Sequence, residues 1–313
     1  MRVAVLGGTR FIGHATARLA ASRGHDVCVL HRGKHPCEIP DARPIAVDRA
    51  DPSELCESLA RLSPDVLIDT RAMTKIDAEV TALALKVLSL RSVVLSSVDV
   101  YAQFGRLNGL PAPEPEALVT EASPLTIPFP FRDIGGHDAG PDYDKKEVES
   151  VIREAVSGGA GGALILRLPA VYGPRDYRRR FGAIVDAVDA GVTTLPCSGG
   201  ASGRLAHAYV TDVAHAIVLA AEKVRDGFDV FHVSEAETPT MRERAEALGR
   251  AMGASITWSE TASLPAPFDS LGRLPNDLVL DTSRIRAVLG FSEISTEEER
   301  LSTTIDWLRS SRA

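Results

Sequence analysis

The sequence lacks the features that would tie the chain to a membrane or to nucleic acid. No apolar run approaches the ~20 residues that a membrane-spanning helix needs. The net charge is −7, and the longest basic run, Arg178-Arg179-Arg180, is too short for a nucleic-acid-binding face. The first apolar run is only as long as a strand and ends in glycines, unlike a secretory signal. We therefore expect a cytoplasmic protein with no membrane or nucleic-acid partner.

Cysteine is also scarce. The four cysteines show no close pairing in sequence that would indicate a metal site or a disulfide framework: Cys28, Cys37, Cys56 and Cys197. We expect reduced thiols and no bound metal. The 313 residues, 44% hydrophobic and 25% charged, are typical of a soluble globular chain with one large domain, or one domain with a smaller lobe.

The most informative feature that is present lies at the start of the chain. Residues 2–6 form a short apolar run that leads directly into glycines and then into a helical pattern at 13–23. Gly7, Gly8 and Gly13 permit a tight turn and leave no Cβ between the backbone and a bound pyrophosphate. The first N–H groups of the helix would point at that anion. This order predicts dinucleotide binding, the alternative being an ordinary strand-to-helix turn.

Strand and helix patterns alternate through the first half of the chain. Runs rich in Val, Ile and Leu predict buried parallel strands at 2–6, 26–30, 43–47, 65–69, 92–96 and 163–168. Helical spacing predicts helices at 13–23, 52–62, 75–89 and 143–157. The alternation predicts an α/β fold, a Rossmann-like doubly wound parallel sheet.

The pattern becomes mixed after residue 169, and a helix at 211–223 and a strand at 228–233 return the chain to the first domain. We therefore assign 1–169 and 207–234 to the sheet domain, and 170–206 and 235–313 to a smaller C-terminal substrate lobe. The stretch 104–141 is rich in Pro and Gly and has no periodicity. A connection of this length predicts a functional lid or a mobile insertion.

The spacing Gly7-x-x-Arg10-x-x-Gly13 resembles the Gly-x-x-Gly-x-x-Gly of extended short-chain dehydrogenases/reductases, the NAD(P)-dependent epimerase/dehydratase family. Arg10 takes the place of the middle glycine. The resemblance implies that the turn and the ends of the following strands bind the cofactor. The implied residues are Gly7, Thr9, Arg10, Phe11, Ile12, Gly13, His31, Arg32, Asp48, Ala72, Lys145 and Leu168.

The end of the second predicted strand indicates which cofactor binds. Folds specific for NAD usually carry Asp or Glu there to accept hydrogen bonds from the ribose 2′-OH, and this chain has His31. Arg32 can form two hydrogen bonds with a 2′-phosphate, which an acid would repel. We predict NADP(H) in preference to NAD(H). In the alternative, Arg32 and Lys34 are solvated surface charges.

The fifth predicted strand ends in Ser96-Ser97-Val98-Asp99-Val100-Tyr101, which resembles the family's Ser-Ser-x-x-Val-Tyr motif. By that resemblance Ser97 hydrogen-bonds the reacting hydroxyl or carbonyl, a task for a group that both donates and accepts. A turn at the strand end is the alternative reading. Sugar-nucleotide dehydratases of the family follow their Thr with Asp-Glu. Here Val98 and Asp99 stand there, and the missing acid argues against an elimination.

The family's acid/base pair, Tyr-x-x-x-Lys, is incomplete. Aligning Lys145 with the family lysine through Glu149 leaves Pro141 at the tyrosine position, with Tyr143 two residues late. Taking Tyr143 as the reference places Glu147 at the lysine position. We therefore predict Tyr143 as acid/base with Lys145 or Lys146. In the alternative, Tyr143 packs at the surface and only Lys145 remains, as a ribose clamp.

The resemblance also implies where the substrate binds. Asp99, Arg204 and Arg273 are candidates, but both arginines are out of register with the arginines that grip a diphosphate in nucleotide-sugar enzymes. We predict an epimerase- or dehydratase-like oxidoreductase for a small metabolite. A simple ketone or imine reductase and a catalytically impaired NADP-binding scaffold are the alternatives. The family also implies a homodimer formed through the helices at 75–89 and 143–157.

Overall fold

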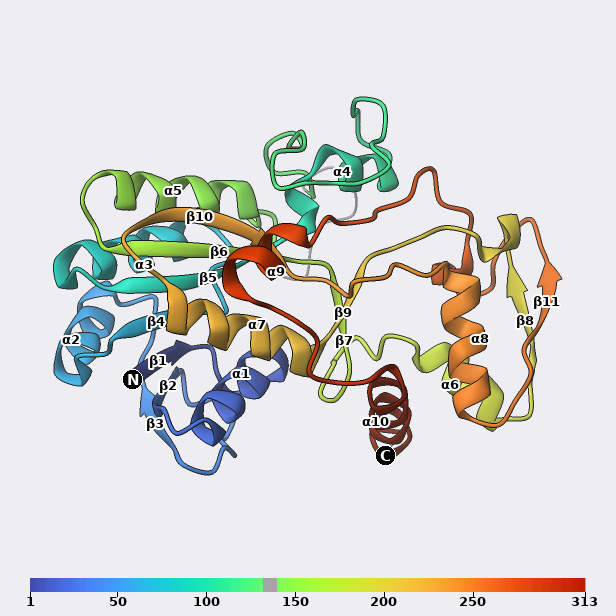
Figure 1. The fold of residues 1–313 in the computed structure, drawn as a ribbon, viewed down its shortest axis with the longest axis horizontal. Helices are drawn as coiled ribbons and strands as arrows, with labels where there is room; N and C mark the ends of the chain where they lie inside the picture. The colour runs from blue at the N-terminus through green and yellow to red at the C-terminus, as the bar shows by residue number, and fades with distance from the viewer. Residues whose placement is uncertain (132–139, 313) are drawn as a thin grey trace.

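The computed structural model describes residues 1–131 and 140–312. Its main sheet, in the part of the chain so described, has seven strands in the order β10-β6-β5-β4-β1-β2-β3 (Figure 1). All neighbouring pairs are parallel, and the order reverses beside β1, as expected of a doubly wound sheet. The strands are β1 (Arg2–Leu6), β2 (Asp26–His31), β3 (Ala42–Ala46), β4 (Val66–Asp69), β5 (Arg91–Ser97), β6 (Gly162–Leu168) and β10 (Gly227–His232).

Helices cover both faces of this sheet (Figure 1). On one face lie α2 (Pro52–Leu62), α3 (Lys75–Leu88) and α5 (Lys145–Ser157), and on the other lie α1 (Phe11–Ser22) and α7 (Val210–Lys223). The side chains of β1 alternate between the two cores, Val3 and Val5 on the α1 side and Ala4 and Leu6 on the α2 side. Burial on both faces explains why the strands read as unbroken apolar runs.

Side chains define where several helices begin, and α1 is an exception. Asp51 accepts hydrogen bonds from the first N–H groups of α2, and Thr74 forms a reciprocal cap with Asp77 at α3. Arg10, at the equivalent position of α1, makes no side-chain cap, and the first turn of α1 has no acidic residue. The α1 terminus therefore keeps N–H donors that no side chain satisfies.

A smaller lobe stands beside the sheet (Figure 1). It contains two parallel strand pairs, β7 (Ala170–Tyr172) with β9 (His207–Tyr209) and β8 (Thr194–Cys197) with β11 (Thr257–Glu260). Helices α6 (Gly182–Asp189), α8 (Met241–Ala251) and α10 (Glu297–Ser310) pack together there. Helix α9 (Ser283–Leu289) instead returns to the sheet domain, against α7 and β10.

The predicted fold class is confirmed, with small differences in local structure. Helix α1 begins two residues earlier than predicted, at Phe11, whose φ is +38°. Part of the stretch 104–141 lies outside the described residues, at 132–139. The described part is anchored: it follows helix α4 (Ala102–Leu107), and Val119 exchanges main-chain hydrogen bonds with the segment that contains Val279. None of the described helices is long and apolar enough to cross a membrane.

Candidate active site

The predicted site residues of the sheet domain collect at the carboxyl ends of the parallel strands. The glycine turn follows β1, Ala72 follows β4, and Ser97 and Leu168 end β5 and β6. This edge, next to the point where the strand order reverses, is where open α/β sheets bind ligands.

The glycine turn has no room for side chains at two positions. A Cβ on Gly7, whose φ is +90°, would lie 2.4 Å from Cγ of Arg71. A Cβ on Gly13 would lie 2.3 Å from the main-chain oxygen of Gly7, so the start of α1 packs directly on the turn. A turn with glycine at its closest approaches, followed by uncapped helical N–H groups, fits a pyrophosphate. The residues present therefore suit the dinucleotide that the sequence predicts.

The rest of the predicted turn surrounds this cradle. Phe11 is buried, whereas Thr9 and Ile12 are partly exposed. Arg10 is exposed, and its guanidinium carbon lies 5.5 Å from the centroid of the Tyr177 ring in the smaller lobe. Arg10 therefore leaves the turn toward the lobe, and its main chain stays available at the helix start.

The residues predicted to surround the adenosine are accessible. His31 is half-buried, and its Nδ1 lies 3.2 Å from the main-chain nitrogen of Gly33. Arg32 is exposed. Asp48 is exposed too, and its carboxylate accepts a hydrogen bond from the main-chain N–H of Ala50, 3.0 Å away.

Arg49 is a residue whose role the sequence did not reveal. Its guanidinium donates two hydrogen bonds to the buried carboxylate of Asp69, at 3.2 and 2.6 Å, and one to Thr81. Burial alone would raise the pKa of Asp69, but the charge and hydrogen bonds of Arg49 act together with hydrogen bonds from Thr81 and the main chain of Arg71 and lower it. The Arg49–Asp69 pair joins the segment after β3 to the end of β4, and the bond to Thr81 joins both to α3.

Lys145 is the first residue of α5 and is buried. Its Nζ donates hydrogen bonds to the main-chain oxygens of Ala72 (2.5 Å) and Leu95 (2.9 Å). Burial lowers the pKa of Lys145 to about 8, against the attraction of Asp99 and Asp69. Lys146 points elsewhere, to the main-chain oxygen of Thr126 (2.6 Å). Of the two lysines left open by the sequence, Lys145 is the one beside Tyr143.

Tyr143 enters the site from the residues that precede α5. The chain there pairs with the loop after β4: Tyr143 bridges Thr74, and the N–H of Asp144 donates to the oxygen of Met73. The Tyr143 ring packs edge-on against Phe131, at a centroid distance of 5.3 Å. Tyr143 is only 4% exposed, so the surface-packing alternative is not what the structure has.

Asp99 is the partner of Tyr143. Oη of Tyr143 donates to Oδ2 of Asp99 over 2.7 Å, and Asp99, in the 3₁₀ turn η1 (Val98–Val100), is 6% exposed. Burial raises the pKa of Asp99 to about 6, against the hydrogen bond from Tyr143 and the charge of Lys145. Burial and Asp99 raise the pKa of Tyr143 well above its usual value, against a hydrogen bond from Ser97. Ser97, Asp99, Tyr143 and Lys145 thus form one cluster, in which Ser97 is partly exposed and the other three are buried.

A second buried network supports the end of β5. Glu149 and Arg167 form a two-bond ion pair, at 2.9 and 2.7 Å, and Oγ of Ser96 donates to Glu149 over 2.6 Å. Arg167 also donates to the phenol oxygen of Tyr101 (2.5 Å), which contacts His232 of β10. In the sequence, Glu149 served only to align Lys145 with the family lysine. The network itself could not be predicted, because its members come from four separate segments of the chain.

The two arginines predicted to contact substrate lie in the smaller lobe. Arg204 is exposed, and its main-chain N–H donates to Asp277 over 2.9 Å. Arg273 is exposed as well, and its alkyl chain lies against Gly199. Leu205, next to Arg204, packs with Val98 and Val100 in a buried cluster, and the roles of Arg204 and Arg273 in substrate binding stay predictions.

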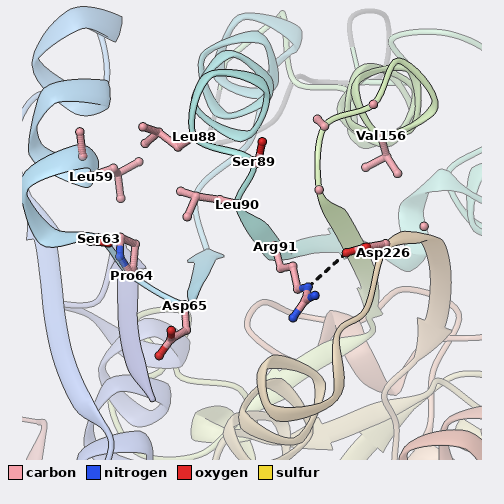
Figure 2. Close-up of a pocket in the computed structure, with 15 residues that line it drawn as sticks. Leu59, Ser63, Pro64, Asp65, Leu88, Ser89, Leu90, Arg91, Val156 and Asp226 are labelled. Carbon is pink, nitrogen blue, oxygen red and sulfur yellow. Dashed lines mark hydrogen bonds and ion pairs between the residues drawn. The ribbon is translucent and has the colours of Figure 1, made fainter.

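A groove of about 750 Å³ lies at the opposite edge of the sheet, where β4, β5, β6 and β10 begin (Figure 2). Its side chains come from the ends of the covering helices and from the residues where the strands begin. They include an ion pair between Arg91 and Asp226, 3.3 Å apart and exposed (Figure 2). None of the predicted site residues lines this groove.

Comparison with known proteins identifies the family. The family described as "NAD dependent epimerase/dehydratase family" matches residues 3–87 and 142–234, more than half of the chain. A curated relative, a 2′-dehydrokanamycin reductase from Streptomyces kanamyceticus, is 28% identical over 297 residues, which cover 91% of this chain and 75% of the relative.

Solved structures show the same fold. A UDP-glucose 4-epimerase from Thermotoga maritima, with UDP-glucose, has a TM-score of 0.74 at 17% identity over the whole of both chains. A dTDP-glucose 4,6-dehydratase from Bacillus anthracis, in complex with NAD, has a TM-score of 0.73 at 16% identity, over 99% of this chain and 97% of the other. The chain belongs to the NAD-dependent epimerase/dehydratase family and is an enzyme of that class, with a nicotinamide dinucleotide as its cofactor.

Proposed function

We propose that the chain is an NADP(H)-dependent oxidoreductase that acts at a hydroxyl or carbonyl carbon of a small metabolite. The observation that carries the proposal is the cluster of Ser97, Asp99, Tyr143 and Lys145 at the carboxyl edge of the sheet. It combines a proton-carrying phenol, a hydroxyl and a cation in one place, and these are the groups that a change between alcohol and ketone needs. A bound nicotinamide would supply or accept the hydride.

The chain's own residues divide the remaining tasks. Lys145 would hold the nicotinamide ribose, and its charge would stabilise negative charge on the reacting oxygen. Ser97 would orient that oxygen, because a hydroxyl can donate to a carbonyl or accept from an alcohol. Tyr143 would exchange a proton with it. The turn from Gly7 to Gly13 and the main chain near Leu168 would hold the rest of the cofactor.

NADP(H) is the cofactor that we propose within the dinucleotide class. His31 takes the position of the acid that binds the ribose in NAD-specific folds, and such an acid would repel a 2′-phosphate. The exposed guanidinium of Arg32 follows His31. Arg10 is exposed on the glycine turn near the same edge. A carboxylate at position 31 would have favoured NAD(H) instead.

Net reduction of a ketone is the reaction that we propose to test first. Val98 stands at the position of one acid of the Asp-Glu pair that the family's dehydratases use for elimination, so this pair is incomplete. The curated relative is a reductase, which favours net redox change over epimerisation. The reason for the scaffold alternative is Pro141 at the position of the family tyrosine. Tyr143 lies in the cluster with Lys145, so a phenol is present there and this reason no longer applies.

We also propose a homodimer in the cytoplasm. Ile76, Leu83 and Val87 follow one face of α3 and are exposed, at 71%, 43% and 62%. Exposed apolar side chains grouped on one helix mark an interaction surface. All four cysteines are free in the structure, as suits a reducing compartment.

Calorimetric titration with NADPH and with NADH tests the cofactor proposal, and NADPH oxidation in the presence of a ketone panel tests the reaction. We expect tighter binding of NADPH and consumption of one NADPH for each ketone reduced. Tight NADPH binding without turnover of any carbonyl compound would favour the scaffold. Turnover without net oxidation of NADPH would favour epimerisation.

A further inference from the structure

The hydrogen bond between Tyr143 and Asp99 decides what Tyr143 can offer a substrate. A phenol has one proton, and in the structure Tyr143 donates it to Oδ2 of Asp99 over 2.7 Å. While Asp99 is ionised, the carboxylate can only accept, so the phenol oxygen faces other groups as an acceptor. A protonated Asp99 can instead donate to the phenol oxygen, and the phenol proton is then available to a third group.

We propose that Asp99 controls the direction in which Tyr143 passes a proton. With Asp99 ionised, Tyr143 accepts from a substrate hydroxyl, the arrangement for oxidation. With Asp99 protonated, Tyr143 donates to a substrate carbonyl, the arrangement for reduction. Asp99 acts through Tyr143 and is therefore a positioning residue. This inference deepens the proposed function and rests on it.

The proton balance closes within this pair. In reduction, the Tyr143 O–H bond breaks as the substrate O–H bond forms, and the Asp99 O–H bond breaks as Tyr143 regains its proton. Asp99 is left as a carboxylate and takes a proton from water before the next turnover. The electron pair that reduces the carbon comes from the reduced nicotinamide of the proposed function. Oxidation runs these steps in reverse.

The surroundings of Asp99 suit a group that changes charge near neutral pH. Asp99 is 6% exposed, and the groups that face its carboxyl come from its own segment and from the start of α5. Ser97 and Tyr143 hydrogen-bond it, the Lys145 cation attracts it, and the Asp144 carboxylate repels it. Burial, the largest of these effects, raises the pKa of Asp99 to about 6, so both forms are populated in the physiological range.

Carbon-13 NMR of protein labelled at aspartate carboxyls tests the coupling in the cofactor-free enzyme. We expect one carboxyl that titrates near pH 6 and that disappears in Asp99→Asn. Tyr143→Phe removes the donor to the carboxylate and should raise that midpoint by about one to two pH units. Asp226→Asn, at an exposed carboxyl on the far edge of the sheet, is the control and should leave the signal in place.

An Asp99 carboxyl that titrates near pH 4, or a midpoint that Tyr143→Phe leaves unchanged, would overturn the proposal. Circular dichroism of each variant identifies one that has failed to fold. In that case Asp99→Glu, which keeps the carboxyl, replaces Asp99→Asn in protein labelled at glutamate carboxyls. Its signal should move with Tyr143→Phe as well.

The pH profile of turnover adds a second test. Ketone reduction by the wild type should fall as pH rises through about 6, and alcohol oxidation should rise over the same range. Asp99→Asn should lose this inflection while it still binds NADPH. Persistence of the inflection in Asp99→Asn would contradict the proposal. Failure of the wild type to bind NADPH or to turn over any ketone would sink the proposed function instead, and the NMR titration would still decide the role of Asp99.

Discussion

The Nζ of Lys145 lies 2.5 Å from the main-chain oxygen of Ala72, so the start of α5 is joined to the loop after β4 by a buried hydrogen bond. A second bond, to Leu95, joins the same ammonium to β5. Lys145 therefore connects three segments at the edge where the cofactor is proposed to bind. Its position makes it part of the framework of the site as well as a candidate ligand.

Lys145→Met should weaken both NADPH binding and stability. The change leaves two buried carbonyl oxygens without their donor, at a cost of about 1–3 kcal/mol in the free energy of unfolding. Urea unfolding and calorimetric titration measure the two effects. Lys146→Met is the matched control, because Lys146 contacts Thr126 instead, and it should bind NADPH as the wild type does. Equal NADPH affinity in Lys145→Met and Lys146→Met would contradict the assignment.

Tyr143→Phe should fold and bind NADPH normally but turn over slowly. Loss of a general acid typically lowers the rate by roughly 10²–10⁴-fold. Steady-state kinetics with a ketone that the wild type reduces measures the turnover rate. Tyr209→Phe, at a buried tyrosine of the smaller lobe, is the control. If Tyr143→Phe kept full activity, the proton would have to reach the substrate without Tyr143.

Arg32→Asp should reverse the cofactor preference. A carboxylate at this position repels a 2′-phosphate and accepts a hydrogen bond from a 2′-OH. The ratio of the dissociation constants for NADPH and NADH, from calorimetry, is the measurement. Arg61→Asp, an exposed arginine at the end of α2, introduces the same charge change away from the site. Equal or tighter binding of NADH by the unmutated protein would rule out the NADP(H) preference.

Glu149→Gln should destabilise the protein by about 3–5 kcal/mol, because it leaves the Arg167 guanidinium buried without its counter-charge. Thermal and urea unfolding test this. The double variant Glu149→Gln with Arg167→Met removes both charges and should recover part of the loss. A single variant as stable as the wild type would show that the ion pair contributes little.

Light scattering at micromolar concentration should give about twice the chain mass of 33.4 kDa. Leu83→Glu places a charge within the exposed apolar face of α3 and should give the monomer mass. Val288→Glu, at an exposed valine on α9, should stay dimeric. A wild-type mass near that of one chain would exclude the dimer.

The local sequence determined the sheet and the cofactor turn. Apolar runs and helical spacing reveal elements that bury their own faces. In the cofactor turn, glycines mark positions where a Cβ cannot fit, among them Gly7 and Gly13. These signals lie within a few residues of one another. For that reason the fold class and the dinucleotide turn could be predicted without the structure.

Only the tertiary structure decided the chemistry of the cluster. Tyr143 and Asp99 are 44 residues apart in sequence, and they meet because the residues before α5 pair with the loop after β4. No rule of sequence spacing predicts that pairing. Because Tyr143 lies two residues after the family's tyrosine position, the sequence could not decide whether Lys145 or Lys146 is its partner. The pairing of Arg49 with Asp69 and of Glu149 with Arg167 was hidden for the same reason. Hydrogen bonds between distant segments depend on how the strands and helices pack, which local patterns do not encode.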